Sequence, residues 1–487
     1  MSAAEEKNAL ALKALFGNDT LADRLTSTHI AVVLPPEALS ASGRLLAEVL
    51  SDVLARLWPC INFHGAEADR MLAVALNAAQ SGGGNGSGLQ VRWAPPYDVV
   101  VAVGCDAPAG AGYTLRVGAD GWDLAMGADA KCGDSVNPVG PAFAAAMAGA
   151  QVFHRVFQSE LSGMAAEPFD SWHVDVRQLF GAAELEVADL DLGETHAFGV
   201  GAVTHGLMWV IEHWPAQASG ALALVDQDKY GSSNGQRYAF MCPTDAGQMK
   251  VATMKNRLEA AHPQLTVTDH PTDLNSYCAI RGFDRPLHRV IAGLDSAEAR
   301  RHVAFKLPER TVNMWTAGER IGAGRYQPTH GGACLACDYL ERADTQLDEV
   351  AELFQQTGVR PDLIRTLLDS GRGLSAEEAV TIASRWGTPA DKFVGQPLRS
   401  VMPALCATGR LQMPNNPEVV DVPFAFASLF AGISGFMMLL KDLKGGDPSE
   451  GWTQHIFKRP TPFLLRALHT RSECVCCSTL SDLATNA

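Results

Sequence analysis

Basic residues are scarce in this chain of 487 residues, and they form no run that could build a basic face. Lys and Arg together number 39 against 54 Asp and Glu, which leaves a formal net charge of -15 at pH 7. A protein that binds nucleic acid needs such a face to neutralise phosphates. The composition therefore excludes nucleic acid as an expected partner.

The N-terminus lacks the basic and then apolar order of a secretory signal, because it reads Met-Ser-Ala-Ala-Glu-Glu-Lys. We therefore expect a cytoplasmic protein, whose eleven cysteines are ligands, nucleophiles or core residues rather than disulfides. Long apolar runs are also few. Residues 422–440 carry no charge and by length alone could span a membrane. The run contains Pro423 and two glycines and has no basic flank before it, so we predict a buried helix and no membrane association.

Apolar residues make up 47% of the chain, enough to bury the cores of two or three domains. Residues 29–34 and 98–104 are strand-like and residues 40–57 are helical, an alternation typical of a parallel α/β sheet. Residues 137–157 and 421–443 share a Pro-led run rich in Ala, Gly and Phe. If this is an internal repeat, the two halves form a pseudo-dimer; two unrelated core helices are the alternative.

A glycine-rich turn reads Gly199-Val-Gly201-Ala-Val-Thr204, and Asp226 ends the next predicted strand. Glycines let the backbone approach a phosphate at a helix N-terminus, and an acid placed further on accepts ribose hydroxyls. Thr204 stands where a third glycine is usual, and such turns also occur without a ligand. The motif therefore needs support from its context.

That support comes from polar residues downstream of the turn. Asp226 and Asp228 are followed by Asn234 and Arg237 in Ser-Asn-Gly-Gln-Arg, and then by Lys250 in Gly-Gln-Met-Lys. Cations beside a ribose-binding acid suit a triphosphate, because charge grows on the leaving pyrophosphate. A dehydrogenase has no such need.

This order of residues resembles the adenylyltransferase superfamily of ubiquitin-activating enzymes and the ThiF/MoeB-type activators of sulfur carriers. The pattern of that superfamily is Gly-x-Gly-x-x-Gly, Asp-x-Asp, Ser-Asn-x-x-Arg and Gly-x-x-Lys, and the resemblance covers roughly residues 194–337 and 400–487. It implies that ATP and Mg²⁺ are cofactors. The nucleotide and magnesium residues that it implies are Gly199, Gly201, Asp226, Asp228, Asn234, Arg237, Lys250, Asp295 and Ser296.

Among these, the resemblance gives catalytic roles to Arg237, Lys250 and Asp295 and makes Asp295 a magnesium ligand. Asp295 follows the predicted strand 290–294, where ligands bind in such folds; a helix N-cap is the alternative. The implied nucleophile is Cys406 in Pro-Ala-Leu-Cys-Ala-Thr-Gly, which precedes the small-residue helix as the family's catalytic cysteine does. A thiolate there could attack an acyl adenylate, and an inert core cysteine is the alternative.

Two Cys-x-x-Cys knuckles, Cys334 with Cys337 and Cys474 with Cys477, can each place two thiolates on one tetrahedral zinc ion. Four sulfurs would close the site and make it structural, and the resembling family carries knuckles at similar places. Cys476 leaves open which thiols ligate. Two redox pairs are the alternative, although no thioredoxin-like context supports them.

The segment between Cys337 and Cys406 looks helical at residues 347–357, 362–369 and 375–386, the last with Ser375 as cap. It resembles the cysteine-domain insertions of ubiquitin-activating enzymes; a decorative helical hairpin is the alternative. We expect an α/β chain with two Rossmann-like adenylation-type domains, the first one degenerate, a helical insertion and a structural zinc site. The expected boundaries are an inactive domain 1–170, a linker 171–193, the active domain 194–337, the insertion 338–402, and the rest of the active domain 403–487.

The N-terminal half lacks the nucleotide residues, since its first predicted strand leads into Pro35-Pro36-Glu37 rather than a glycine turn. In the family a second copy, which can be inactive and fused, contributes an arginine to the ATP site, and Arg24 is the nearest candidate here.

The resemblance therefore implies an enzyme that adenylates the C-terminal carboxylate of a ubiquitin-like protein, forms a thioester on Cys406 and passes it to a ubiquitin-conjugating-like enzyme. The fused half and the insertion are most similar to activating enzymes of bacterial (Bil-type) antiphage operons; further dimerisation is open. A sulfur-carrier adenylyltransferase and a non-catalytic nucleotide-binding scaffold are the alternatives.

Overall fold

The computed structural model divides the chain into two compact units, residues 1–339 with 419–487 and residues 340–418. The residues that it describes are 2–16, 21–109, 112–161, 168–282, 287–340, 353–354, 357–370, 372–386, 389–396, 398, 424–445 and 449–477. The larger unit holds two sheets, a large apolar core that both of them share, and smaller apolar clusters beside it. The predicted α/β class is therefore confirmed.

The first sheet has seven strands. The first five in spatial order are parallel to one another, and each of the last two pairs antiparallel with the strand before it. In spatial order its strands are β3 (Leu89–Val91), β2 (Ile61–His64), β1 (Ile30–Val33), β4 (Val99–Val103), β5 (Thr114–Asp120), β6 (Asp123–Met126) and β7 (Trp172–Asp175). The central strands β1 and β4 are buried on both faces, which explains their unbroken apolar sequences. Its helices are α1 (Ala3–Phe16), α2 (Ala22–Ser27), α3 (Ala41–Ala55), α4 (Ala68–Ser81), α5 (Val139–Val156), α6 (Gln158–Leu161) and α7 (Val176–Leu179).

The second sheet repeats this strand order and adds one more antiparallel strand. In spatial order its strands are β10 (Leu265–His270), β9 (Ala218–Val225), β8 (Leu190–Phe198), β11 (Arg289–Ala292), β12 (Arg310–Ala317), β13 (Arg320–Tyr326), β14 (Glu450–His455) and β15 (Leu465–Ala467). The helices of this half are α8 (Ala202–Glu212), α9 (Lys250–Ala261), α10 (Leu274–Arg281), α11 (Ala297–Ala304), α12 (Leu335–Asp338) and α17 (Ala425–Leu443). Short 3-10 turns are η2 (Ser232–Gln236), η3 (Pro243–Asp245), η4 (Pro328–His330) and η6 (Pro462–Leu464).

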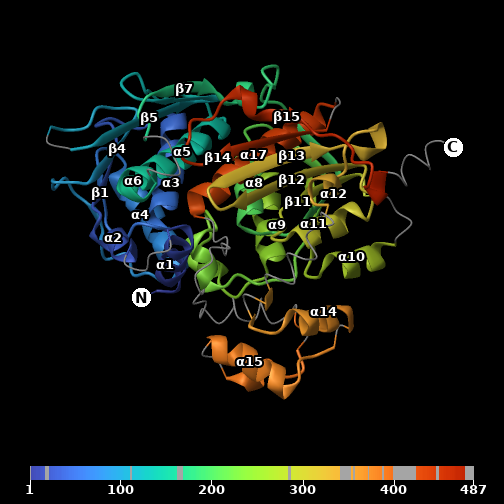
Figure 1. Cartoon of the computed structure of the whole chain (residues 1–487). Coiled ribbons are helices and arrows are strands. Elements are labelled where there is room, and N and C mark those ends of the chain that lie inside the picture. The colour runs from blue at the N-terminus through green and yellow to red at the C-terminus, as the bar shows by residue number, and fades with distance from the viewer. Residues whose placement is uncertain are drawn as a thin grey trace. The chain divides into compact units, whose positions relative to one another are not determined.

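The two small-residue helices noted in the sequence, α5 and α17, pack against each other and join the two halves (Figure 1). The rings of Phe143 and Phe430 meet edge to face with centroids 4.5 Å apart. Gly149 permits the contact, because a Cβ there would lie 3.1 Å from the Cβ of Phe426. The repeated strand order and this contact support the predicted pseudo-dimer, which stays a prediction.

The predicted linker 171–193 is partly built into the sheets. Residues 172–175 form β7, which pairs with β6 at the edge of the first sheet, and β8 of the second sheet begins at Leu190. The two halves are therefore joined by a short connection that carries α7 and is anchored at both ends. Composition did not reveal β7, because an edge strand of four residues has little periodicity of its own.

Helix α17 is long and apolar enough to span a membrane by length and composition, but 94% of its most apolar window is buried inside the protein. It packs against α5, α8, β12 and β13. Gly432 on α17 and Gly206 on α8 bring the two backbones together. A Cβ on Gly432 would lie 2.5 Å from the carbonyl oxygen of Val203. The predicted buried helix with a small-residue face is therefore confirmed.

Replacing Gly432 by Ala is expected to lower the free energy of unfolding by about 1–3 kcal/mol, because the new methyl group overpacks a contact between two backbones. Urea denaturation followed by tryptophan fluorescence measures this loss. Gly231→Ala is the matched control, since its φ of −96° suits alanine and a Cβ there would have no atom nearer than 3.8 Å. Equal stability of the two variants would contradict the close helix crossing.

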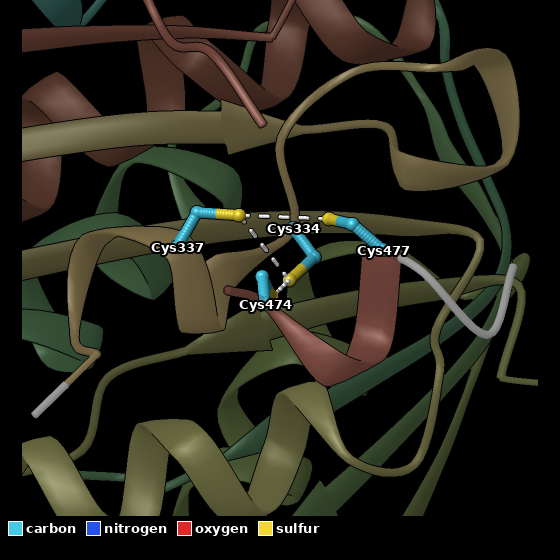
Figure 2. Close-up of side chains that lie close together, drawn as sticks. All are labelled: Cys334, Cys337, Cys474 and Cys477. Carbon is cyan, nitrogen blue, oxygen red and sulfur yellow. Dashed lines mark hydrogen bonds between the residues drawn. The ribbon is translucent and has the colours of Figure 1, made fainter. Parts of the chain in front are cut away.

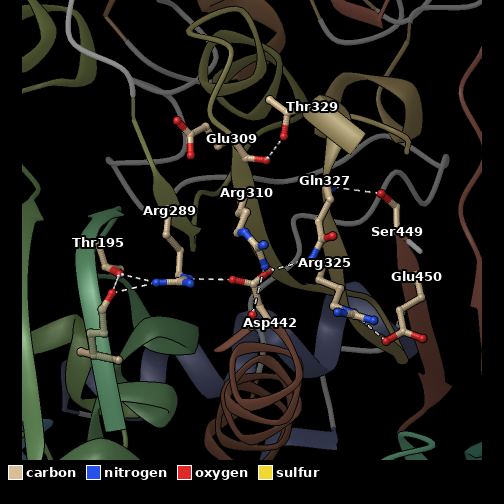
Figure 3. Close-up of polar contacts among 11 residues, drawn as sticks. Thr195, Arg289, Glu309, Arg310, Arg325, Gln327, Thr329, Asp442, Ser449 and Glu450 are labelled. Carbon is tan, nitrogen blue, oxygen red and sulfur yellow. Dashed lines mark hydrogen bonds and ion pairs between the residues drawn. The ribbon is translucent and has the colours of Figure 1, made fainter. Parts of the chain in front are cut away.

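A buried charge network secures the C-terminal end of α17 (Figure 3). Asp442 is fully buried and accepts hydrogen bonds from Arg289 (2.6 Å), Arg310 (3.4 Å) and Gln327 (3.1 Å). Cations at a helix C-terminus also offset its partial negative charge. Arg289 and Arg310 begin β11 and β12, so the network lies at the amino ends of the parallel strands, opposite the edge described next.

The smaller unit, residues 340–418, has an apolar core of its own. It contains α14 (Pro361–Ser370), α15 (Ala376–Trp386) and the 3-10 turn η5 (Ala390–Lys392). Ser375 and Glu378 form a capping box, in which each side chain accepts a hydrogen bond from the backbone N–H of the other (3.3 and 2.7 Å). The helices predicted at 362–369 and 375–386 are confirmed, whereas most of 347–357 lies outside the described residues.

Candidate active site

The predicted nucleotide residues gather at the carboxyl edge of the second sheet, where the strand order reverses. Strand β8 lies between β9 and β11: the chain runs outward from β8 through β9 to β10 on one side and then returns to β11 on the other side of β8. In open parallel sheets, ligands bind in the crevice outside such a point. Gly199 follows β8, Asp226 follows β9, and Gly293 follows β11. The three loops therefore lie together at this edge of the sheet, and we call the space outside this edge the crevice.

The glycine turn is shaped by close backbone contacts. Gly199 has a φ of +83°, and a Cβ there would lie 2.7 Å from the carbonyl oxygen of Gly293, so only glycine fits. Gly201 is the N-cap of α8. Thr204 is buried and turns back into the turn, donating a hydrogen bond to the Gly199 carbonyl at 2.6 Å. Its side chain therefore points away from the crevice, which is why this departure from the glycine pattern leaves the turn intact.

Asp226 links the turn after β8 to the loop after β9. Its two carboxylate oxygens accept hydrogen bonds from the backbone N–H groups of Val200 (2.7 Å) and Asp228 (2.8 Å). The Asp226 side chain is 9% exposed, and burial raises the pKa of this carboxyl group above its usual value, while Lys250 lowers it. The predicted ribose acid thus has a fixed position at the edge of the crevice.

Lys250, the first residue of α9, extends its ammonium group toward both acids. Its Nζ lies 2.8 Å from Asp228 and 3.8 Å from Asp226. Burial by itself lowers the pKa of Lys250, but Tyr238, Asp226 and Asp228 outweigh it and the pKa is raised. The side chain is only 6% exposed. A permanently charged ammonium group is therefore held at the crevice, which suits contact with a phosphate.

The 3-10 turn η2 presents the other predicted cation. Asn234 closes the turn, because its Oδ1 accepts the backbone N–H of Gly231 at 2.9 Å. Arg237 follows the turn and is half-buried. Its guanidinium group lies over the ring of Tyr238 at 5.5 Å and makes no hydrogen bond to a described residue. Arg237 is thus supported by an aromatic ring, and its donors are not used by any residue in the part of the chain that the structure describes.

Tyr238 was not anticipated from the sequence, yet it lies at the centre of the site. Its ring is also 5.6 Å from the Lys250 ammonium group, so one aromatic ring supports both cations. A Cβ on Gly201 would lie 3.9 Å from the Tyr238 hydroxyl. His205, an unusual residue for this position, packs against the ring and hydrogen-bonds Tyr230 at 2.5 Å. The aromatic residue directly after Arg237 was the only available signal.

Two roles were considered for Asp295, a magnesium ligand and a helix N-cap, and the structure gives the N-cap role to Ser296. Ser296 is the N-cap of α11 and accepts the backbone N–H of Ala299 at 3.1 Å. Asp295 is exposed, two residues beyond Gly293, and its carboxylate has no ion pair or hydrogen bond to a described residue. The N-cap alternative for Asp295 is therefore wrong. A single free carboxylate fits Mg²⁺, which is held by one or two carboxylates together with phosphates.

The corresponding edge of the first sheet carries a partly exposed ion pair of its own. Glu67 follows β2 as Asp226 follows β9, and it likewise accepts a backbone N–H of the neighbouring loop, from Leu39 at 3.2 Å. Arg44 occupies the same carboxylate with two hydrogen bonds of 2.9 Å. Hydrogen bonding to Arg44 lowers the pKa of Glu67. The Glu67 carboxylate is therefore occupied by Arg44. That the first half is a degenerate domain stays a prediction.

Arg24 does not contact a predicted nucleotide residue within the described chain. It pairs with Glu160 at 2.7 Å, donates to the Val156 carbonyl at 3.2 Å and lies over the Phe157 ring. These partners hold it at the end of α5. The predicted nucleophile Cys406 and the rest of its motif lie outside the described residues.

The two cysteine knuckles meet although 140 residues separate them (Figure 2). The Sγ atom of Cys334 lies 3.8 Å from that of Cys337 and 3.4 Å from that of Cys474, and Cys337 lies 3.5 Å from Cys477. Tetrahedral zinc with Zn–S bonds of about 2.3 Å places its sulfurs about 3.8 Å apart. These four thiols could hold a zinc ion, and the buried Cys476 is not in the group.

Comparison with known proteins matches residues 186–431 to the ThiF family. An uncharacterized protein, y4jF, of Sinorhizobium fredii is 30% identical over 430 residues, which cover 85% of this chain and 82% of the relative. The crystal structure of E. coli MccB with ATP matches 59% of this chain and 68% of MccB, with 11% identity and a TM-score of 0.35.

Proposed function

This chain belongs to the ThiF family, and from that premise we propose that it activates a carboxylate with ATP by adenylation. Family membership supports ATP use. The observation that carries the proposal is the arrangement at the carboxyl edge of the second sheet. A glycine turn, a buried carboxylate and two cations on one aromatic ring border the same crevice.

In the proposed reaction the carboxylate oxygen attacks the α-phosphate of ATP and pyrophosphate leaves, so that a P–O bond forms as another breaks. Asp226 accepts the ribose hydroxyls. Arg237 and Lys250 offset the charge that develops on the leaving pyrophosphate, an effect that is strong in a partly buried site. Asp295 would hold Mg²⁺, whose chemistry is to neutralise phosphate oxygens. The product is a mixed anhydride, which is a far better electrophile than a carboxylate.

We further propose that the carboxylate is the C-terminus of a ubiquitin-like protein and that Cys406 receives it as a thioester for a ubiquitin-conjugating-like enzyme. The motif order of the second half supports the first point, and the compact helical unit of residues 340–418 supports the second. Fusion of a degenerate half to an active one also agrees with the bacterial antiphage systems that the sequence resembles. Zinc in the four-thiol cluster would be structural, because four protein sulfurs leave no open position.

Mixing the protein with ATP, Mg²⁺ and a ubiquitin-like protein encoded beside its gene is expected to give a thiol-labile adduct of one ubiquitin-like chain. Intact mass under non-reducing conditions measures the adduct, and a pyrophosphate assay follows the first step. The adduct is expected to vanish in Cys406→Ala, because that thiolate is the proposed acceptor. Cys242→Ala is the matched control, since Cys242 is exposed and lies near the site loop.

The two readouts separate the alternatives. Pyrophosphate release without an adduct would overturn the thioester step and favour a sulfur-carrier adenylyltransferase. Nucleotide binding with neither product would leave a non-catalytic scaffold. An adduct that persists in Cys406→Ala but is lost in Cys242→Ala would move the nucleophile to Cys242.

A further inference from the structure

A buried ion pair in the first half, Arg56 with Asp52, contacts the loop of residues 235–241 in the second half. Arg56 follows α3, and Asp52 lies one helical turn before it. Their side chains are 0% and 5% exposed and are joined by two hydrogen bonds of 2.9 and 2.7 Å. Burying both charges is costly, and the cost is recovered only when their remaining hydrogen-bonding groups find partners.

Those partners are backbone groups of the loop that carries Arg237. Arg56 donates to the carbonyl oxygens of Gly235 at 2.7 Å and Met241 at 3.0 Å. Asp52 accepts the backbone N–H of Phe240 at 3.1 Å. The loop is thus held on both sides of Arg237, by contacts that span between 179 and 188 residues of sequence.

The same loop is pressed against the first half by a glycine contact. A Cβ on Gly235 would lie 2.5 Å from the backbone nitrogen of Gly82 and 2.6 Å from the carbonyl oxygen of Ser81. Arg56 also donates to the Ser81 hydroxyl at 2.9 Å. The loop therefore has little room to move while the ion pair is intact.

We propose that Arg56 and Asp52 are positioning residues for adenylation, which place Arg237 on the triphosphate without touching the nucleotide themselves. The proposal rests on the proposed function. It gives the degenerate half a second role besides completing the core: it sets the geometry of the loop that binds the pyrophosphate part of ATP. The groups proposed to bind AMP are Asp226 for the ribose and the glycine turn for the phosphate that AMP retains. Within the described residues their hydrogen bonds are made to the second half.

If the pair acts only on the loop that carries Arg237, removing it should weaken the binding of ATP but not the binding of AMP. We use the double variant Asp52→Leu with Arg56→Met, because removing a buried pair together is far less disruptive than leaving one charge alone. Calorimetric titration is expected to show ATP·Mg²⁺ binding weakened about 10- to 100-fold, the contribution of hydrogen bonds to a charged group. AMP binding is expected to stay within twofold, because AMP lacks the β- and γ-phosphates.

A double-mutant cycle tests whether the pair acts through Arg237. Arg237→Ala is expected to weaken ATP binding in the native background and to have little further effect in the double variant. Arg44→Met is the matched control, since Arg44 lies on the same helix and its ion pair with Glu67 lies at the corresponding edge of the first sheet; it should leave the ATP to AMP affinity ratio unchanged. An additive Arg237 effect, an unchanged ATP affinity, or an equal loss for AMP would each overturn the proposal.

Amide hydrogen exchange in the free protein tests the restraint on the loop without requiring nucleotide binding, so it distinguishes an error in this proposal from an error in the proposed function. In the free protein, amides of residues 235–241 are expected to exchange faster in the double variant, while those of α8 and β9 keep their protection. If the native protein binds no nucleotide, the proposed function fails, yet faster exchange still shows the restraint on the loop. If ATP binds but the loop amides exchange alike in both proteins, the restraint itself is wrong.

Discussion

Lys250→Met is expected to lower the rate of pyrophosphate release by about 100- to 1,000-fold, the usual cost of removing one charged group that stabilises a developing charge. The ammonium group lies at the crevice between Asp226 and Asp228 and is supported by the Tyr238 ring. Methionine keeps the length and apolar volume of the side chain but not its charge. Pyrophosphate release with ATP, Mg²⁺ and the carboxyl substrate measures the effect.

The control for this variant is Lys255→Met on the same helix. Lys255 pairs with Asp269 at 3.4 Å and is 31% exposed, so its loss should leave the rate within about twofold, because an exposed ion pair contributes little. A Lys250→Met rate within threefold of the native rate would show that this lysine does not act on the triphosphate.

In the variant Lys250→Met we also expect a change in how AMP binding depends on pH. Asp226 must be ionised to accept ribose hydroxyls, so AMP binding is present above its pKa and lost as the pH falls through it. Burial raises that pKa, and Lys250 is the main opposing influence. Removing Lys250 is therefore expected to move the loss of AMP binding to a higher pH, which titration of AMP at several pH values measures. An unchanged pH profile would mean that the two groups are not coupled.

Cys334→Ser is expected to abolish zinc binding and to lower the free energy of unfolding by about 5 kcal/mol, because metal binding to such a site is folding free energy and closes a long loop. Cys334 has two of the sulfur contacts, to Cys337 and Cys474. The ion would tie the start of α12 to the C-terminal knuckle, across 140 residues of chain. Metal analysis of the purified protein gives the zinc content, and denaturation gives the stability.

Cys476→Ser is the matched control, since Cys476 is buried beside the cluster but is not among its four thiols. It should keep one zinc per chain. Loss of zinc in Cys476→Ser with retention in Cys477→Ser would reassign the fourth ligand. A native protein without zinc, whose knuckle thiols oxidise and reduce reversibly, would favour two redox pairs instead.

The elements and motifs that depend on near neighbours could be predicted from the sequence. The glycine turn, the Ser375 cap and the buried character of α17 are encoded by spacing within a few residues, because φ preferences, capping and burial periodicity act over one or two turns. The strand β7 was missed because its four residues are too few to show a strand pattern, and they are recognised as a strand only through their pairing with β6. The run 422–440 was predicted to form an internal helix because it contains Pro423 and two glycines and has no basic flank before it.

The chemical groups of this protein can be identified from the sequence: the acids, the two cations, the glycine turn and the paired cysteines. Which of these groups lie together follows from the folding of distant segments against one another. That folding placed Tyr238 under Arg237 and Lys250, turned Thr204 inward, left Cys476 outside the four-thiol cluster, and gave the loop contacts to Arg56. The physical reason is distance along the chain. Contacts across more than a hundred residues arise from how the two sheets pack, and no local spacing encodes them.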